Sequence, residues 1–278
     1  MTTSTLPHEN RLAVNDVVSL DKSLPLWARR SNPIIRRQLG AHWRVFPPEL
    51  RPIAIWIGYY IAFLAISLTG ADFIFIFFIP FALVSAVVFP AILYLYIRSL
   101  GQVIADSATA MVTEYTHDSL TLLRTTPFDT MEIVLSKISG AVWRRMDDVQ
   151  DITTYTRTMG GMVILGSYII LFSPANNPYV AQFLALPMLI ASLVRVPLEL
   201  VMVASIATML GAYTKSRNSA ILATTIFAFF YFLLLLLLRF LGWHWSVQWV
   251  IDAVLPIILP IGIIYGALMM TKRAIEND

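Results

Sequence analysis

Apolar residues fall into long runs along this chain, and polar residues gather between the runs. About 20 helical residues suffice to cross a bilayer, and we expect six transmembrane helices, at residues 52–69, 73–97, 159–173, 179–213, 219–238 and 249–270. The fourth run would form a helix of about 52 Å, against a hydrocarbon core of about 30 Å. It contains Pro187 and Pro197, so we expect either one kinked span or a span followed by a re-entrant half.

Composition places the chain in the membrane. It is 58% hydrophobic and 13% charged, whereas soluble domains carry about 25% charged residues. The expected fold class is an all-α polytopic membrane protein. The absence of cysteine excludes disulfides and thiolate metal sites, and no pattern indicates nucleic-acid binding.

Basic residues give the expected topology, because Lys and Arg concentrate on the cytoplasmic side of membrane proteins. Residues 1–51 hold eight of them, the polar gap at 98–158 holds six, and four more lie at Lys215, Arg217, Lys272 and Arg273. An even number of spans with both termini in the cytoplasm puts all of these on one side. We therefore expect a multi-pass protein of the cell membrane.

The two ends of the chain are expected to be cytoplasmic tails, at residues 1–30 and 274–278, the first poorly ordered. Between them lies the transmembrane domain, residues 31–273. Ser31-Asn32-Pro33 is typical of a helix start, and apolar residues then recur at helical spacing between arginines. This predicts an amphipathic helix at 33–46 that lies in the membrane interface. The alternative is a cytosolic helix packed on its neighbours.

A spaced pattern occupies residues 114–137 of the polar gap. It comprises Glu114, Asp118-Ser119-Leu120, Leu122-Leu123, Thr125-Thr126-Pro127, Glu132-Ile133 and Lys137. The pattern resembles the cytoplasmic loop of type-2 ABC transporter permeases, although Asp118-Ser119 stands where Gly-Thr is usual and Ser136 where Gly is usual. The helix at 33–46 resembles the elbow helix of that family, and residues 211–218 resemble the short turn before its fifth span.

The family's loop contains a coupling helix, and the residues here suit one. Asp118 or Ser119 can cap it, Leu120 and Leu123 share one face, and Pro127 ends it by forcing Thr126 out of the helical region. A helix of two turns is marginal alone in water, so we expect it to dock into a partner. The alternative is packing on the chain's own interfacial surface. The residues expected to couple to an ATPase are Glu114, Asp118, Ser119, Leu120, Leu123, Arg124, Thr126 and Pro127.

The expected partner is a separate ATPase subunit, because this chain lacks a P-loop. Its only lysines are Lys22, Lys137, Lys215 and Lys272, and none follows a glycine. ATP and Mg²⁺ are therefore expected in the partner, with no cofactor and no enzymatic activity in this chain. The resemblance also implies a second permease, identical or related, and favours export over import. The substrate is not indicated.

Two further groups of charged residues have alternative interpretations. Arg195 and Glu199 lie four apart within the fourth run, and we expect them to pair with each other or across a dimer, either as a structural pair or as a substrate or gating contact. Asp147, Asp148 and Asp151 could bind Mg²⁺ in a membrane prenyltransferase, but no second acidic cluster faces them. A solvated helix face with an Arg144–Asp148 ion pair explains them more simply. A membrane scaffold without transport activity is the third alternative.

Overall fold

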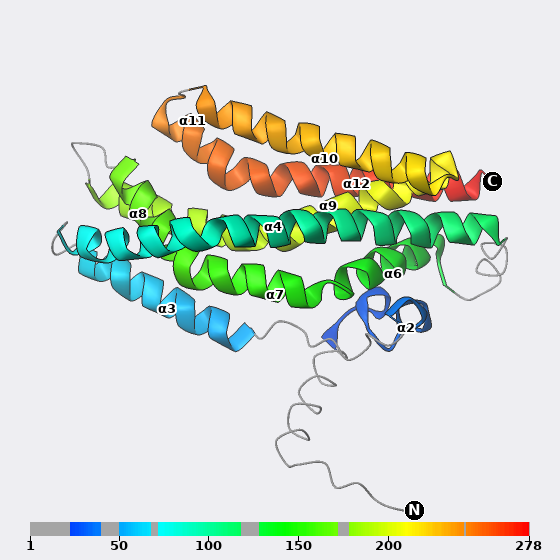
Figure 1. Cartoon of the computed structure of the whole chain (residues 1–278), viewed down its shortest axis with the longest axis horizontal. Coiled ribbons are helices and arrows are strands. Elements are labelled where there is room, and N and C mark those ends of the chain that lie inside the picture. Colours follow the sequence, from blue (N-terminus) through cyan, green and yellow to red (C-terminus); the bar gives the residue numbers. More distant parts are fainter. Residues whose placement is uncertain are drawn as a thin grey trace, which may run out of the picture.

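The computed structural model describes residues 23–39, 50–67, 72–117, 128–171, 178–241 and 243–277. Every regular element in these ranges is a helix (Figure 1), so the all-α class is confirmed. In chain order the elements are η1 (Leu26–Ala28), α2 (Pro33–Leu39), α3 (Leu50–Ser67), α4 (Asp72–Thr116), α6 (Thr130–Trp143), α7 (Met146–Tyr155), η3 (Thr156–Gly160), α8 (Gly161–Leu171), α9 (Pro178–Thr214), α10 (Arg217–Phe240), α11 (Trp245–Trp249), η4 (Val250–Val254) and α12 (Leu255–Glu276).

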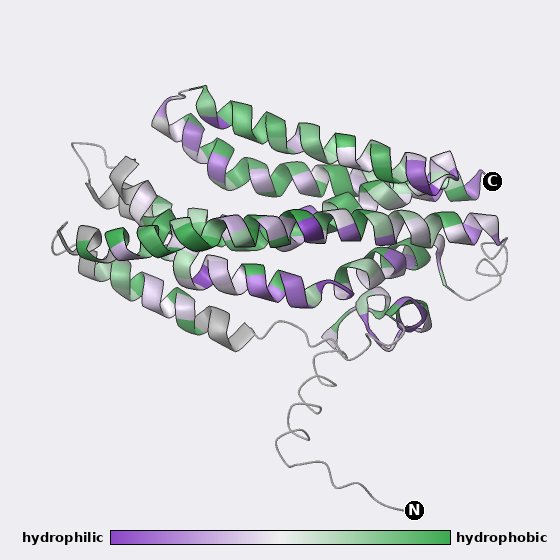
Figure 2. Cartoon of the chain, viewed as in Figure 1, coloured by the Kyte–Doolittle hydropathy of each residue, from purple (hydrophilic) through white to green (hydrophobic). Residues whose placement is uncertain are grey.

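Four helical segments among the described residues are long and apolar enough to cross a membrane. They are Phe78–Thr116, Leu184–Thr214, Arg217–Phe240 and Ser246–Glu276, and Figure 2 shows that hydrophobic residues predominate along them. The first and third predicted spans are helical as α3 and α8, but neither belongs to these four. The structure thus supports a membrane protein, while the count of six spans stays a prediction.

The long axis of the molecule has two distinct ends. The last turn of α4, the first turn of α6, the α9–α10 junction and the last turn of α12 lie together at one end, on the right in Figure 1. We call this the loop end. The last turn of α3, the first turn of α4, the last turn of α8 and α11 lie at the opposite, far end. Successive long helices therefore run in alternating directions.

Helix α4 connects the two ends without interruption. Its 45 residues include Pro80 and Pro90 and correspond to about 67 Å of helix. We had expected the second span to end at residue 97 and a loop to follow, but the helix continues to Thr116. Buried side chains at Val103, Ile104 and Met111 explain the extension, because they recur at helical spacing and pack on the neighbouring helices.

Helix α9 forms the centre of the bundle, packed against α4, α8, α10 and α12. It is a single helix of 37 residues with Pro187 and Pro197 inside, so no re-entrant half interrupts it. Residues 202–208 are all buried, as expected for a helix enclosed on every side. Gly211 approaches α4 so closely that an added Cβ would lie 3.3 Å from the carbonyl oxygen of Ala108.

The predicted helix start at residue 33 is confirmed. Asn32 caps α2, because its side-chain oxygen accepts a hydrogen bond of 2.9 Å from the Ile34 backbone N–H. The apolar residues Ile35 and Leu39 are buried against Trp143 of α6. The apolar face of α2 is thus covered by protein, which agrees with the alternative of a helix packed on its neighbours. Residues 40–46, the rest of the predicted elbow helix, lie outside the described residues.

Candidate functional site

The predicted coupling residues fall between two described helices at the loop end. Glu114 lies in the last turn of α4, and thirteen residues separate the end of α4 at Thr116 from the start of α6 at Thr130. Seven predicted residues lie outside the described ranges: Asp118, Ser119, Leu120, Leu123, Arg124, Thr126 and Pro127. We call residues 118–127 the coupling segment. The coupling helix itself stays a prediction, whereas the structure describes α4 and α6 on either side of the segment.

The first and last residues of the sequence pattern form a buried ion pair. Lys137 Nζ lies 2.8 Å from Glu114 Oε1, and the two side chains are only 3% and 12% exposed. Lys137 also donates a hydrogen bond of 3.2 Å to the carbonyl oxygen of Ala110. This pair joins α4 to α6 on both sides of the coupling segment. Sequence reasoning had included both residues in the pattern but had not predicted their contact.

Burial lowers the pKa of Lys137 below its ordinary value, and nearby Arg37 lowers it further. The hydrogen bond and the charge of Glu114 oppose this change. The ammonium group therefore depends on Glu114 for its charge in this position. Removal of the carboxylate would leave a lysine in a site that disfavours its protonated form.

Ser136, which replaces the glycine usual in the family pattern, joins α6 to the start of α2. Its hydroxyl accepts a hydrogen bond of 3.1 Å from Asn32 Nδ2, and Asn32 also donates to the Leu26 carbonyl oxygen at 3.0 Å. Both residues are buried, so the contact satisfies polar groups that water does not reach. The cap of α2 is thereby fixed to the residue next to Lys137.

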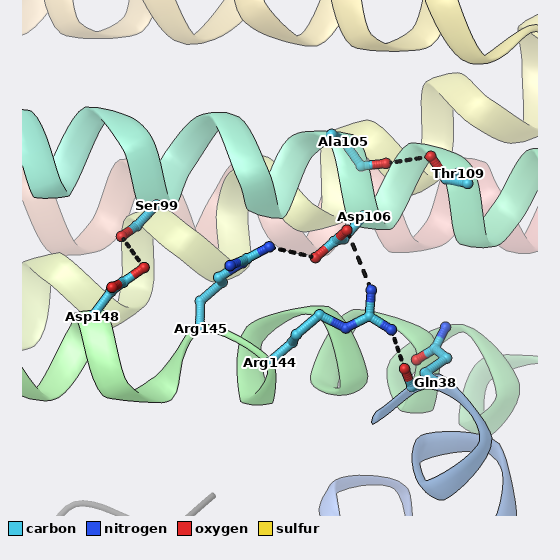
Figure 3. A network of polar contacts seen from close by, with 8 residues as sticks. All are labelled: Gln38, Ser99, Ala105, Asp106, Thr109, Arg144, Arg145 and Asp148. Atoms are coloured by element: carbon cyan, nitrogen blue, oxygen red, sulfur yellow. Dashed lines mark hydrogen bonds and ion pairs between the residues drawn. The ribbon is translucent and has the colours of Figure 1, made fainter. Parts of the chain in front are cut away.

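A second polar network links α4 to the α6–α7 junction (Figure 3). Asp106 of α4 forms ion pairs with Arg144 at 3.3 Å and with Arg145 at 3.5 Å. Arg144 also donates to the backbone carbonyl of Gln38. The expected Arg144–Asp148 pair is therefore wrong: Arg144 lies at the break between α6 and α7 and turns toward α4. Asp148 instead accepts a hydrogen bond of 3.2 Å from Ser99.

The acidic residues Asp147, Asp148 and Asp151 lie along α7 without forming a metal site. No group of three His, Cys, Asp or Glu side chains within the described ranges is arranged to hold a metal ion. Asp147 and Asp151 are exposed, and Asp148 is engaged with Ser99. The geometry of the described residues gives no support to the diphosphate-binding alternative.

Arg195 and Glu199 pair with each other, as one of the two expected arrangements had it. Arg195 Nε lies 2.6 Å from Glu199 Oε1, and Glu199 is 1% exposed. Two tyrosines that sequence reasoning missed also donate to this carboxylate: Tyr231 of α10 at 3.2 Å, and Tyr96 of α4. The available signal was the presence of tyrosines in apolar runs, since a buried tyrosine hydroxyl needs a partner.

A further ion pair lies at the far end, where no sequence pattern predicted one. Arg239 Nε lies 2.7 Å from Asp252 Oδ1, and Gln248 donates to the other carboxylate oxygen at 3.0 Å. The pair joins the last turn of α10 to η4. The contact neutralises Arg239, which stands at the end of an apolar helix.

A cavity of about 520 Å³ opens at the loop end beside the Glu114–Lys137 pair. Helix α2, the last turns of α4, helix α6 and the first residue of α10 form its walls. Its charged lining comprises Asp106, Glu114, Arg37, Lys137, Arg144 and Arg217. The charged cavity therefore lies beside α4 and α6, the two helices that flank the coupling segment in the sequence.

Compared with known proteins, the chain matches no family model, and it has no significant match among curated proteins or solved structures.

Proposed function

We propose that this chain is the membrane-spanning subunit of a type-2 ABC transporter, driven by separate ATPase subunits that dock on the coupling segment. The observation that supports this most is the buried Glu114–Lys137 pair. The pair joins α4 and α6, the two helices that flank the coupling segment in the sequence. Its two members are the first and last residues of the pattern that resembles the family's cytoplasmic loop.

The arrangement suits the transmission of a mechanical displacement. A partner that moves residues 118–127 would move the last turn of α4 and the first turns of α6 together, because the ion pair holds them to each other. Helix α4 is continuous from there to the far end. A movement at the loop end would therefore reach the far end through a single helix, without a hinge loop between.

The remaining parts of the proposal follow from the resemblance. The alternating directions of the long helices favour six passes, with both termini in the cytoplasm. Two permease subunits, identical or related, would face each other and form the path for the substrate, with export as the favoured direction. ATP and Mg²⁺ would be bound and used by the ATPase subunits.

Copurification tests the docking role. The tagged chain is expected to retain an ATPase from native membranes, and Leu120→Asp with Leu123→Asp should reduce retention by tenfold or more, because burying two carboxylates in an apolar groove is strongly unfavourable. Leu26→Asp serves as the control, because it changes an exposed leucine that lies away from the coupling segment. Undiminished binding by the Leu120/Leu123 variant would contradict the proposal.

A further inference from the structure

Among the residues that the structure describes, the cavity at the loop end has more cationic than anionic side chains. Four cationic side chains and two carboxylates line it. Glu114 is paired with Lys137, and Asp106 with Arg144. In the ranges that the structure describes, no ion pair engages Arg37 or Arg217, and both are exposed. The open cavity thus presents two uncompensated guanidinium groups.

These two arginines come from elements that are distant in the sequence. Arg37 lies on α2, and Arg217 is the first residue of α10. The charge of Arg37 acts on the cavity lining, since it helps to lower the pKa of Lys137. Guanidinium groups bind phosphate oxygens through paired N–H donors. Because Arg37 and Arg217 line the same cavity, both can supply N–H donors to one phosphate group.

The position of Arg217 places the cavity at the membrane surface. The apolar segment Arg217–Phe240 begins at this residue, so the guanidinium stands at the end of a candidate span. Basic pockets at this level between transmembrane helices bind the head groups of anionic lipids. A soluble phosphate compound has the same chemistry, but a lipid would also bring its acyl chains to the apolar surface of α10, where Leu222 and Ile226 are exposed.

We infer that this cavity binds the phosphate head group of an anionic phospholipid, held by Arg37 and Arg217. The bound head group connects α2 to the start of α10, above the ion pair that joins α4 and α6. Four elements of the loop end are then tied around one anion. The inference concerns binding by this chain alone and does not depend on the transporter assignment.

Native mass spectrometry of the detergent-purified chain tests the inference. Phosphatidylglycerol and phosphatidylcholine are added separately, and pyrophosphate is added in a third arm as a soluble anion. We expect retention of phosphatidylglycerol but not of phosphatidylcholine. Arg37→Gln with Arg217→Gln should lower that retention by about tenfold or more, since hydrogen bonds to charged groups contribute about 1.5–3 kcal/mol each and 1.4 kcal/mol is tenfold.

The matched control is Arg36→Gln with Arg273→Gln, which removes the same charge from exposed residues that do not line the cavity. It should retain the lipid as the unmodified chain does. Arg37→Lys with Arg217→Lys keeps the charge and should retain an intermediate amount. Equal losses in the control and test variants, equal binding of phosphatidylcholine, or binding of pyrophosphate in place of the lipid would each overturn the inference. Unchanged thermal midpoints establish that the variants are folded.

Discussion

Two buried ion pairs in this protein use the same chemistry in different ways. Glu114 and Lys137 come from different helices and join α4 to α6 at the loop end. Arg195 and Glu199 lie four residues apart on α9, so their charges are neutralised within one helix, and only neutral tyrosine hydroxyls extend the contact to α4 and α10. The Glu114–Lys137 ion pair joins two helices, whereas the Arg195–Glu199 ion pair lies within one helix.

The difference follows from the surroundings of each pair. In the apolar bundle, an unpaired charge is costly, and a partner on the same helix cannot be lost when helices shift. At the loop end the pair is also buried, and because it lies between helices it would hold the end of α4 to α6 while residues 118–127 engage the proposed partner. Under the proposed function, the comparison predicts that α4 and α6 move as a unit while α9 stays fixed.

The largest expected effect comes from breaking the pair at the loop end. Lys137→Met removes the ion pair of the buried Glu114 carboxylate with Lys137, and loss of one member of a buried pair lowers the free energy of unfolding by about 3–5 kcal/mol. Titration with denaturing detergent, followed by tryptophan fluorescence, measures this change. Glu114→Leu combined with Lys137→Met should recover most of the loss.

Lys272→Met provides the matched control for that experiment. Lys272 pairs with Glu276 at 3.6 Å, with side chains 35% and 49% exposed, so its removal should change the free energy of unfolding by less than about 1 kcal/mol. Equal effects of the two lysine substitutions would show that the Glu114–Lys137 pair has no special structural role.

A smaller loss is expected from the pair within α9. Glu199→Gln keeps an oxygen for the two tyrosines but leaves Arg195 without a counter-charge, which costs about 2–3 kcal/mol on insertion scales. Tyr231→Phe removes one hydrogen bond and should cost about 0.6 kcal/mol, and no more than about 1.7 kcal/mol, as for interhelical hydrogen bonds within membranes. The same titration gives both values, and a larger loss for Tyr231→Phe would reverse the interpretation of this site.

The smallest effect is expected at Asp106. Asp106→Asn removes the charge opposite Arg144 and Arg145, but these three side chains are between 23% and 34% exposed. Water and salt can compensate there, so the expected change is about 1 kcal/mol or less. A loss as large as that of Lys137→Met would mean that the second network, too, fixes α4 to α6.

Much of the fold could be predicted from apolar runs and helix-start signals. Helix α10 lies within two residues of the predicted fifth span at each end, and α2 begins at the predicted Pro33. The extension of α4 beyond residue 97 was missed, because a search for apolar runs overlooks an amphipathic helix whose buried residues are separated by polar ones. Val103, Ile104 and Met111 were the available signal.

The contacts of the candidate site were less predictable, because they join residues far apart in the sequence. Asp106 and Arg144 are 38 positions apart, and only the packing of α4 against the α6–α7 junction brings them together. The pair within α9 could be anticipated, since a spacing of four places both side chains on one face. Local spacing thus predicts local pairs, while pairs between helices need the tertiary structure.

Site-specific photocrosslinking in native membranes tests the central claim most directly. A photoreactive side chain is introduced at residue 123 of the coupling segment, and in a second variant at Leu93, an exposed residue in the apolar part of α4. We predict that residue 123 crosslinks to a protein with a P-loop, identified by mass spectrometry, and that residue 93 does not. If residue 123 crosslinks only to α2, α6 or another part of this chain, the coupling segment packs on its own protein and the proposed function is wrong.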